Sequence, residues 1–485
     1  MKKCIIHIKD EINVKLEGLD VVLRRTLEKK LKFFQPHAYH TPAYKLGRWD
    51  GCVSFCSIGG ATYLNLLDRL LPFIVDDGYS IEIRDDRTAH EFVFPEITDA
   101  FHGSTVWPVG HVDAGKPVML RDYQVTAIQE FIKNPQCLQE ISTGAGKTLM
   151  TATMSKLVEP YGRSIVIVPN KDLVRQTVAD YENLGLDVGV YFGDKKEIGK
   201  THTICTWQSL NSMEKRFKEG LSELSLAEFG EGMVAVIVDE VHQAKADVLQ
   251  KLLSGAFANV PIRWGLTGTI PKEEYEQVGI FATLGVVVNT LAASDLQEQG
   301  VLANCDVNVV QLADDVEYKT YQEELSYLTT NQKRINYLSN MFAKISESGN
   351  TLILVDRVKC GEMIAEAIPG SVFVSGATKS TDRKDEYDEI KTASNKIIIA
   401  TYGVAAVGIN IPRIFNLVMV ESGKSFTRVI QSIGRGIRKA HDKDSVQIWD
   451  ITSNAKFAKK HLTVRKKYYE EARYPYKVNK IKWKF

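Results

Sequence analysis

Hydrophobic residues change their spacing along the chain, and this separates a front segment from the rest. Residues 12–16 alternate between apolar and polar, as in a strand with one buried face. Apolar residues then recur every three or four positions in residues 19–34 and 66–75, as in amphipathic helices. A further strand-like run covers residues 52–58. Residues 1–112 are therefore predicted to form a small α+β domain with its linker.

From about residue 118 the sequence pattern changes to apolar runs that alternate with helical segments, which is typical of a parallel sheet covered by helices. The predicted core strands are residues 164–168, 233–238, 351–355, 396–400 and 417–420. Two such sheets fit the remaining length, with a break near residues 290–305 that is predicted to be helical or loop-like. The fold class is thus α/β, and the predicted domains are 1–112, 113–295, 296–455 and a C-terminal tail, 456–485.

Composition and charge narrow the class of protein. The 485 residues are 44% hydrophobic and 25% charged, as in a globular protein, and the net charge is only +1. Any affinity for nucleic acid must then come from local basic patches. The seven cysteines lack the paired spacing of a zinc site, and no run of about 18 apolar residues could span a membrane. We expect a cytoplasmic protein with reduced thiols and no membrane partner.

Residues 142–148, Ser-Thr-Gly-Ala-Gly-Lys-Thr, give the strongest chemical signal. In such a loop Lys147 can reach the β- and γ-phosphates of ATP, and the Thr148 hydroxyl can ligate Mg²⁺. Ile141 stands where the strict pattern has its first glycine, but the remaining spacing favours a phosphate site over an ordinary glycine-rich loop. The backbone N–H groups that would surround the phosphates belong to Thr143, Gly144, Ala145 and Gly146.

Two carboxylates, Asp239 and Glu240, follow the apolar run 234–238. An acidic pair after an apolar strand is, by itself, more often a solvated turn. Because this pair follows a phosphate loop by about ninety residues, it predicts instead that Asp239 holds Mg²⁺ and that Glu240 orients and deprotonates the attacking water. ATP and Mg²⁺ are the predicted cofactors.

The sequence Asp239-Glu240-Val241-His242 resembles the DExH branch of the superfamily 2 helicases, and the other motifs of that family follow in order. Residues 121–124 look like the adenine-reading motif, which implies that Arg121 and Gln124 contact the adenine of ATP. Residues 265–269 resemble the motif that couples hydrolysis to strand binding. Residues 168–176 and 206–209 resemble two strand-gripping motifs, which implies nucleic-acid contacts by Pro169, Asn170, Lys171, Thr206, Trp207 and Gln208.

The second half of the chain carries three further resemblances, in residues 351–357, 401–410 and 431–438. Arg435 and Arg438 stand three positions apart, so they can face one site on a helix. They could merely form the polar face of a surface helix, but the family resemblance implies arginine fingers for ATP. The implied contacts are Arg357, Thr401 and Tyr402 for nucleic acid, Gly408 and Asn410 for ATP, and Gln431, Arg435 and Arg438 for catalysis.

Residues 33–34, 44–51, 67–73 and 321–324 resemble phage UvsW-type branch-migration helicases. This resemblance implies two RecA-like lobes behind the α+β domain and a monomer in the host cytoplasm. It further implies branched duplex DNA with a tracked single strand as the substrate, or an RNA–DNA hybrid. The implied activities are fork regression, Holliday-junction migration and the removal of R-loops or D-loops in phage recombination and repair.

Two segments each allow two interpretations. Lys45, Arg48 and Trp49 could contact the backbone of a duplex, or form a tight turn with an aromatic plug. In residues 456–485, lysines and tyrosines could bind a strand, or the tyrosines could pack on the second lobe while the lysines stay solvated.

Other functional classes also stay open on the residues alone. The ATPase motifs do not separate a DNA helicase from an RNA helicase, although the DEAD signature is absent. A non-catalytic DNA-binding scaffold that retains the fold is another alternative. It would be favoured if Lys147, Glu240 or Arg438 were replaced by another residue, but all three are present.

Overall fold

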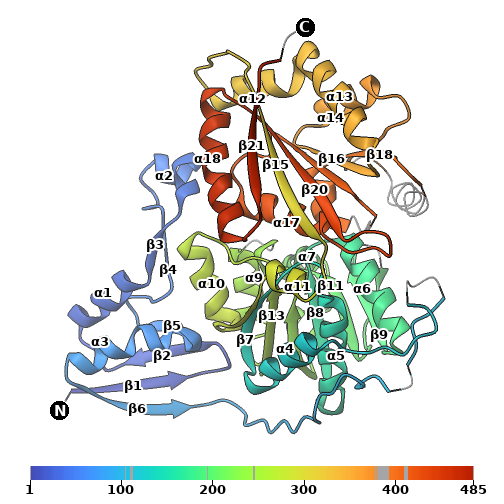
Figure 1. Cartoon of the computed structure of the whole chain (residues 1–485). Coiled ribbons are helices and arrows are strands. Elements are labelled where there is room, and N and C mark those ends of the chain that lie inside the picture. Colours follow the sequence, from blue (N-terminus) through green and yellow to red (C-terminus); the bar gives the residue numbers. More distant parts are fainter. Residues whose placement is uncertain are drawn as a thin grey trace. The chain divides into compact units, whose positions relative to one another are not determined.

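The computed structural model describes residues 2–103, 105–109, 113–193, 195–243, 246–376, 378, 393–408 and 413–483. Close packing divides the chain into two compact units (Figure 1). The first unit is Met1–Ile141 with Gly146–Thr290, and the second is Ser142–Ala145 with Leu291–Phe485.

A small α+β domain forms the front of the first unit, as predicted. Its sheet has the order β5-β2-β1-β6, in which β1 and β2 are antiparallel and β1 and β6 are parallel. Asp20 caps the first helix by accepting a hydrogen bond from the backbone N–H of Leu23 at 2.9 Å. The elements are β1 (Lys2–Ile8), β2 (Asn13–Glu17), α1 (Val21–Lys30), β5 (Ala61–Tyr63), η2 (Leu64–Arg69), α3 (Leu71–Asp76) and β6 (Tyr79–Asp85).

An antiparallel two-stranded ribbon, β3 (Lys32–Phe34) with β4 (Cys52–Ser54), extends from this domain. Between its strands the chain forms η1 (Pro36–His40) and α2 (Pro42–Lys45). The predicted strand at 52–58 is cut short at Ser54, because Phe55 and Cys56 turn into the core of the domain, where both are buried.

Lobe 1, the rest of the first unit, is built on an eight-stranded sheet of order β10-β9-β11-β8-β12-β13-β7-β14. Its central strands are nearly continuous apolar runs, because helices cover both faces. The predicted strand 233–238 coincides with β12. The strands are β7 (Gln136–Ile141), β8 (Arg163–Val168), β9 (Val188–Phe192), β10 (Lys195–Lys196), β11 (His202–Thr206), β12 (Met233–Val238), β13 (Ile262–Thr267) and β14 (Val287–Leu291).

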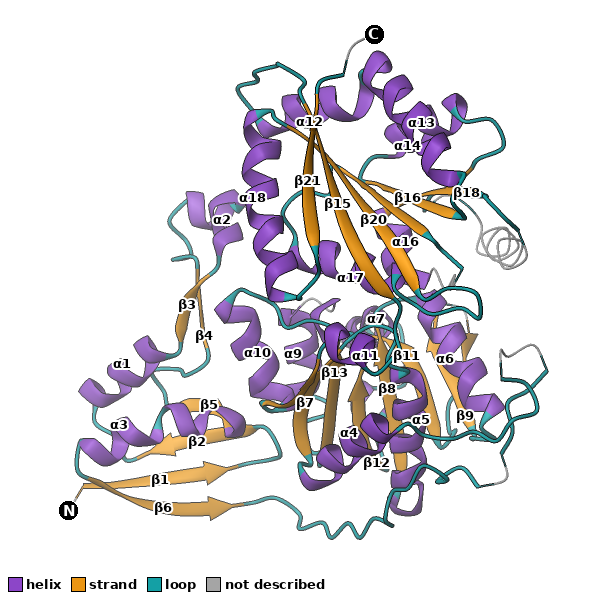
Figure 2. Ribbon diagram, viewed as in Figure 1, coloured by secondary structure: helices purple, strands orange, loops and turns teal. Residues whose placement is uncertain are grey.

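Two groups of helices cover this sheet (Figure 2). One group shares a core with β8 and β12: α7 (Trp207–Lys218), α8 (Leu226–Phe229), α9 (Ala246–Ser254) and α10 (Glu274–Leu284). The other group is α4 (Asp122–Lys133), α5 (Lys147–Val158) and α6 (Lys171–Asn183), with the short turns η3 (Glu159–Tyr161) and η4 (Val241–Gln243) elsewhere in the lobe.

The front domain packs firmly against lobe 1. Val278 and Ala282 of α10 lie in the same hydrophobic core as the front-domain residues Leu27 and Leu70. The turn between β1 and β2 also bonds to lobe 1, since the N–H of Glu11 donates to the Ala258 carbonyl at 3.1 Å. The two parts therefore belong to one compact unit.

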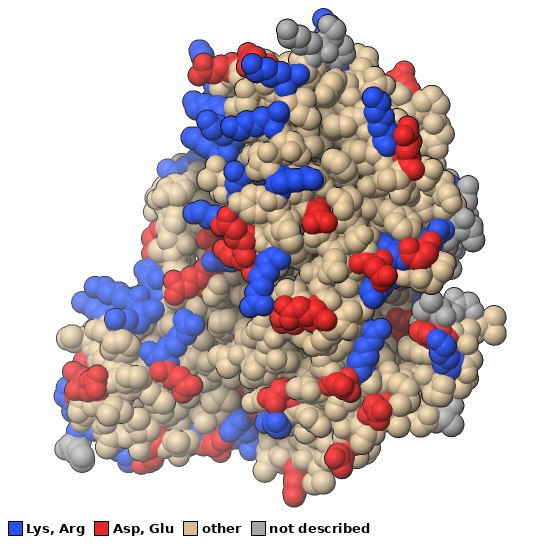
Figure 3. All heavy atoms as spheres, viewed as in Figure 1, with Lys and Arg blue, Asp and Glu red and all other residues tan. Residues whose placement is uncertain are grey.

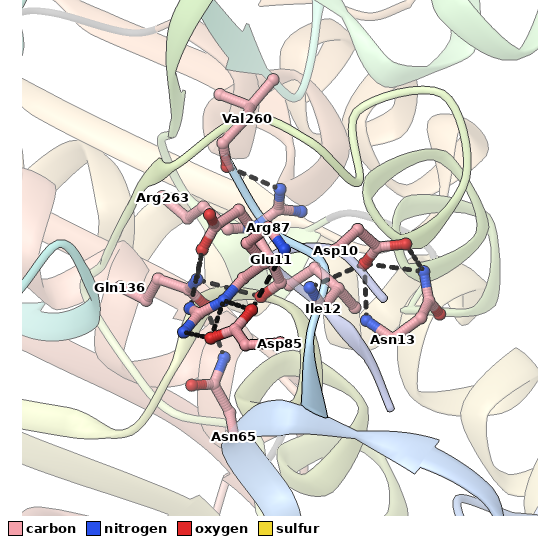
Figure 4. Close-up of polar contacts among 10 residues, drawn as sticks. All are labelled: Asp10, Glu11, Ile12, Asn13, Asn65, Asp85, Arg87, Gln136, Val260 and Arg263. Carbon is pink, nitrogen blue, oxygen red and sulfur yellow. Dashed lines mark hydrogen bonds and ion pairs between the residues drawn. The ribbon is translucent and has the colours of Figure 1, made fainter. Parts of the chain in front are cut away.

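Figure 4 shows how this junction reaches the first residues of two lobe 1 strands. Gln136, the first residue of β7, donates to the backbone oxygen of Glu11 at 3.0 Å and accepts from Asn65 at 2.8 Å. Arg263, near the start of β13, is fully buried. Its guanidinium donates to the carbonyls of Leu253, Phe257, Val260 and Thr283 at 2.7 to 3.3 Å.

Lobe 2, the main part of the second unit, has a seven-stranded sheet of order β17-β18-β16-β19-β20-β15-β21, with parallel neighbours throughout. This confirms the predicted α/β class with two RecA-like lobes. The strands are β15 (Asn304–Leu312), β16 (Thr351–Val355), β17 (Val372–Val374), β18 (Ile397–Thr401), β19 (Asn416–Val420), β20 (Ser445–Ser453) and β21 (Tyr476–Ile481). The helices are α11 (Ala293–Glu298), α12 (Tyr321–Thr330), α13 (Gln332–Ser346), α14 (Val358–Ala367), α16 (Tyr402–Gly408), α17 (Phe426–Gly436) and α18 (Lys456–Glu471).

The segment from residue 456, set apart above as a tail, is part of lobe 2. Strand β21 pairs with β15 and forms an edge of the sheet. Helix α18 packs through Arg465, which pairs with Asp450 at 2.9 Å, and through Tyr469, whose hydroxyl donates to Asp450 at 2.8 Å. The tyrosine-packing interpretation of this segment is therefore what the structure shows.

The interval 290–305 is mostly helical or irregular, as expected, since β14 ends at Leu291, α11 follows, and β15 begins only at Asn304. Across the described ranges, the structure holds no helix long and apolar enough to cross a bilayer.

Candidate nucleotide site and nucleic-acid groove

The glycine-rich loop connects the end of β7 to the start of α5 and makes two left-handed turns. Gly144 has φ 91° and Gly146 has φ 80°, values that residues with a Cβ rarely adopt. Gly146 directly precedes the first turn of α5, where backbone N–H groups have no partner within the helix. Such a helix start is suited to binding an anion.

Lys147 brings a buried ammonium group to this loop. Its Nζ lies 3.0 Å from Oε1 of Glu240 and donates to the Ile141 carbonyl at 3.3 Å. Both side chains of the Lys147–Glu240 pair are about nine-tenths buried. Lys147 and the acidic pair, ninety residues apart in sequence, thus occupy one site.

Asp239 and Glu240 follow β12 directly. Asp239 is buried, and burial together with the neighbouring Glu240 charge raises the pKa of its carboxyl group, while Lys147 opposes this shift. Oδ1 of Asp239 accepts the backbone N–H of Glu240 at 2.8 Å. Glu240 itself has φ 50°, a left-handed conformation that costs a non-glycine residue on the order of 1–3 kcal/mol. Functional sites often retain such strain because it directs a side chain.

The end of β13 contacts the same acidic segment. Nδ1 of His242 lies 2.5 Å from the Thr267 hydroxyl, which donates to the Thr269 carbonyl at 2.8 Å. The N–H of Gly268 points to Oε2 of Glu240 at 3.5 Å. Residues 265–269 are therefore in direct contact with the acidic segment, so a movement of Glu240 would affect them.

The donor set at this site fits a magnesium ion. Mg²⁺ prefers carboxylate and hydroxyl oxygens and keeps several waters. Asp239 supplies carboxylate oxygens at the end of β12, and Thr148 supplies a hydroxyl in the first turn of α5. Both positions belong to the first unit.

Gln124 lies directly against the glycine-rich loop. A Cβ at residue 146 would lie only 2.5 Å from Nε2 of Gln124, so the Gln124 side chain would have to move if this glycine were replaced. Oε1 of Gln124 accepts the N–H of Arg121 at 2.9 Å, while Arg121 is exposed and reaches the Tyr123 hydroxyl at 3.1 Å. The segment 121–124 is therefore well placed to meet a nucleotide that occupies the loop.

A groove of about 440 Å³ lies where β8 and β11 end. Asn170 caps α6 by accepting the N–H of Leu173 at 2.9 Å, and Thr206 caps α7 by accepting that of Ser209 at 3.3 Å. Gln208 joins the two segments by donating to the Pro169 carbonyl at 3.2 Å. The predicted strand-gripping residues that line it are Pro169, Asn170, Lys171, Thr206 and Gln208.

The groove also contains cations that the motifs do not include. Lys196 of the β9–β10 hairpin and Arg216 of α7 both line it. The Lys195-Lys196 pair in the sequence was the available signal for the first. Trp207 behaves differently from its neighbours, because its ring packs against the core of lobe 1 and its indole nitrogen is buried.

In lobe 2 the predicted nucleic-acid residues follow two strand ends. Arg357 stands after β16 and donates to Oε1 of Gln322 at 2.7 Å. Thr401 ends β18 and is half-buried. Tyr402 is buried, and the Arg428 guanidinium lies 5.0 Å from the centre of its ring. Of the two residues at the end of β18, only Thr401 is partly accessible.

The predicted arginine-finger segment lies on and just after α17. Gln431 is buried on this helix, and Arg438 follows its end. Lys443 anchors that end, since its buried Nζ donates to the carbonyls of Gly436 at 2.5 Å and Arg438 at 2.8 Å. Burial lowers the pKa of Lys443 to about 7. Gly408 ends α16, while Asn410 and the side chain of Arg435 lie outside the described residues.

The front-domain turn combines features of both interpretations given for it. Lys45 and Arg48 are exposed. Trp49 is half-buried and acts as a plug, because its indole N–H donates to the Cys52 carbonyl at 2.8 Å. Gly51, with φ 77°, lies so close to the Phe34 ring that a Cβ would be 2.4 Å from it. The cations stay available on a rigid turn.

Comparisons with known proteins cover most of the chain. The family model "Type III restriction enzyme, res subunit" matches residues 117–272, and "Helicase conserved C-terminal domain" matches residues 333–440. The ATP-dependent DNA helicase uvsW of Enterobacteria phage T4 is 24% identical over 458 residues, which are 90% of this chain and 88% of that relative. The DNA 3'-5' helicase XPB of Mycobacterium tuberculosis is 24% identical over 74% of this chain and 65% of its own.

A solved structure shows a similar fold. The structure of S. cerevisiae Dbp5 bound to RNA and ADP BeF3 superposes with a TM-score of 0.54 at 14% identity. It covers 74% of this chain and 90% of Dbp5. At this identity the likeness concerns the fold alone.

Proposed function

Because this chain is an ATP-dependent superfamily 2 helicase related to the phage UvsW helicase, we propose that it uses ATP hydrolysis to move along one strand of branched DNA. The observation that carries the proposal is the contact between Lys147 and Glu240 at 3.0 Å beside the buried Asp239. A cation at the start of a helix and two carboxylates at the end of a strand are groups that phosphoryl transfer from ATP uses.

In the proposed mechanism Lys147 and the N–H groups of the glycine-rich loop bind the phosphates of ATP. Glu240 orients the attacking water and accepts its proton. Asp239 and Thr148 would hold Mg²⁺, which would supply positive charge to the phosphates when bound. Arg435 and Arg438 neutralise charge that develops in the transition state, while Gln124 and Arg121 read the adenine. His242 couples the position of Glu240 to Thr267, because Nδ1 of His242 lies 2.5 Å from the Thr267 hydroxyl.

The tracked strand is proposed to occupy the groove on lobe 1. Asn170, Thr206 and Gln208 offer backbone and side-chain donors, and the cations Lys171, Lys196 and Arg216 neutralise phosphates. None of these contacts reads a base, so the motor moves on any sequence. Arg357 and Thr401 are proposed to hold the same strand on lobe 2.

The front domain is proposed to recognise the branch. Lys45 and Arg48 present two exposed cations on a turn that Trp49 holds rigid, which suits the backbone of a duplex. The activities that this arrangement would support are fork regression, Holliday-junction migration and the unwinding of R-loops or D-loops in phage recombination and repair. We propose that the chain acts as a monomer.

ATPase stimulation tests this function directly. Turnover is compared with single-stranded DNA, linear duplex, forked DNA, a four-way junction and RNA of equal nucleotide concentration. The proposal expects the largest stimulation with forked or four-way DNA. Stimulation by RNA above all DNAs would instead establish an RNA helicase, and no ATP turnover with any of them would favour a non-catalytic scaffold.

A further inference from the structure

Lysines run along the solvent face of α18, and Figure 3 shows Lys and Arg side chains gathered over this helix. Lys456, Lys459, Lys460 and Lys467 are exposed, and Lys466 is half-buried. We call these five residues the α18 lysine row. Within the described ranges, none of the five forms an ion pair, whereas exposed lysines elsewhere do, such as Lys200 with Asp187 at 2.7 Å. The row is thus a solvent-exposed set of lysines held by no ion pair in the described residues.

The opposite face of α18 explains why the row points outward. Ala458, Leu462, Arg465 and Tyr469 are buried at spacings of four, three and four residues, which is one stripe of a helix. The ion pair of Arg465 with Asp450 fixes the rotation of the helix on the sheet. The lysines therefore cannot turn inward without breaking a buried ion pair.

The length of the row matches a stretch of nucleic-acid backbone. From Lys456 to Lys467 the helix rises about 16 Å, at 1.5 Å per residue. One strand of a duplex rises about 3.4 Å per nucleotide, so the row spans roughly five nucleotides. Exposed Lys477, Lys480 and Lys482 on and after β21 enlarge the basic surface of the same segment.

Two acids lie near one end of the row. Asp315 and Glu317 border a hollow that Lys456, Lys459 and Lys460 also line. The helix's own exposed Glu470 and Glu471 lie at the other end. With these four acids counted against the five lysines, one positive charge remains on α18, and the exposed Lys477, Lys480 and Lys482 add three more. Net attraction for an anionic backbone is retained.

Four of the described aromatic residues of this segment are engaged within lobe 2. Tyr469 and Tyr474 are buried, and the hydroxyl of Tyr468 donates to the Lys424 carbonyl at 2.9 Å. Trp483 packs against the core of lobe 2. Because single-strand recognition depends on stacked bases while duplex recognition can use phosphates alone, this face suits a duplex.

We propose that the α18 lysine row binds the sugar-phosphate backbone of duplex DNA, as a contact surface additional to the groove on lobe 1. This inference rests on the proposed function, since it supplies a grip on the duplex arm that adjoins the tracked strand. The binding is sequence-independent and depends on salt.

The test compares two double variants of the full chain. Lys456→Ala with Lys467→Ala removes both ends of the row, and Lys333→Ala with Lys344→Ala removes two exposed lysines with the same spacing on α13. Affinity for a labelled 20-bp duplex is measured by fluorescence anisotropy between 50 and 200 mM salt. Basal ATPase and thermal midpoint of both variants should equal those of the wild type, because neither pair touches the ATP site or a core.

The expected result is a slope of log K against log salt that is smaller by up to about 1.8 in the α18 variant, since each phosphate contact contributes about 0.9. The α13 variant should keep the wild-type slope. An unchanged slope in the α18 variant overturns the inference, as does displacement of the duplex by polyglutamate at equal charge concentration, which would indicate an acidic protein partner. Failure of the proposed function is separate: it would appear as wild-type ATPase that no nucleic acid stimulates.

Discussion

At the scale of single residues, Lys147 has the most direct link to ATP. Lys147→Ala removes the ammonium group beside Glu240, so phosphate binding loses its buried cation. We expect ATP hydrolysis to be abolished while the circular dichroism spectrum and thermal midpoint stay near those of the wild type. Lys156→Ala, on the same helix but outside the loop, is the control and should hydrolyse ATP normally. Near-normal turnover by folded Lys147→Ala would refute the site.

Glu240→Gln keeps the shape of the side chain and removes the proposed base. ATP and DNA should still bind, and single-turnover hydrolysis should slow by at least about 10²-fold, the lower range for lost general-base catalysis. A filter-binding assay on the same sample checks that ATP is held. If the single-turnover rate does not change, Glu240 is not the base.

Sequence motifs located backbone positions better than side-chain directions. Asp239 and Lys147 lie together because a strand end and a helix start meet at one edge of a parallel sheet, which spacing along the chain can predict. Tyr402 and Trp207 also occupy motif positions, yet both rings pack inward. Lys196 and Arg216 line the groove without belonging to a motif. The β9–β10 hairpin places Lys196 there, and the later part of α7 places Arg216.

At the scale of elements, apolar strands were predictable and the last helix was harder to place. The prediction 233–238 coincides with β12 because every residue of that run is apolar. The inward stripe of α18 contains Arg465, so hydrophobic periodicity alone could not show which face packs. Its buried partner Asp450 is fifteen residues away and on another element.

Glu324 of α12 caps α18 from outside the helix. Its buried carboxylate accepts the N–H groups of Phe457 and Ala458 at 2.7 to 3.0 Å, and the local N-cap residue, Ala455, has no side chain that could do so. Glu324→Gln places an amide where only acceptors fit. We expect a loss of about 1–3 kcal/mol in the free energy of unfolding, from urea titration.

Glu323→Gln is the control for this change. Glu323 is exposed and bonds only within its own helix cap, to the N–H of Thr320 at 3.0 Å. Its substitution should cost less than that of Glu324. Equal losses would mean that the tertiary cap contributes nothing beyond a local one.

At the scale of the whole molecule, the proposed DNA-binding role of the front domain cannot be tested simply by deleting the domain. Deleting residues 1–112 would expose Val278 and Ala282 and remove the partners of Gln136, so lost activity could reflect a damaged lobe 1. Point variants on the exposed turn avoid this difficulty.

Lys45→Ala with Arg48→Ala should reduce the salt slope of duplex binding by up to about 1.8 if both side chains contact phosphates. Lys9→Ala with Lys29→Ala, two exposed lysines of the same domain, should leave the slope unchanged. Junction unwinding should fall in the first variant and basal ATPase should persist. Equal slopes for both variants would leave the turn with a purely structural role.

The hydrogen bond from the Glu11 N–H to the Ala258 carbonyl crosses from the front domain to lobe 1. An amide held in this way exchanges its proton for deuterium only when the bond opens. The exchange rate of this backbone position therefore measures how often this bond at the junction opens, with no label attached and no side chain altered. A peptide spanning residues 9–13, followed by mass spectrometry in the presence and absence of ATP and DNA, would reveal which of them loosens or tightens the junction during the working cycle.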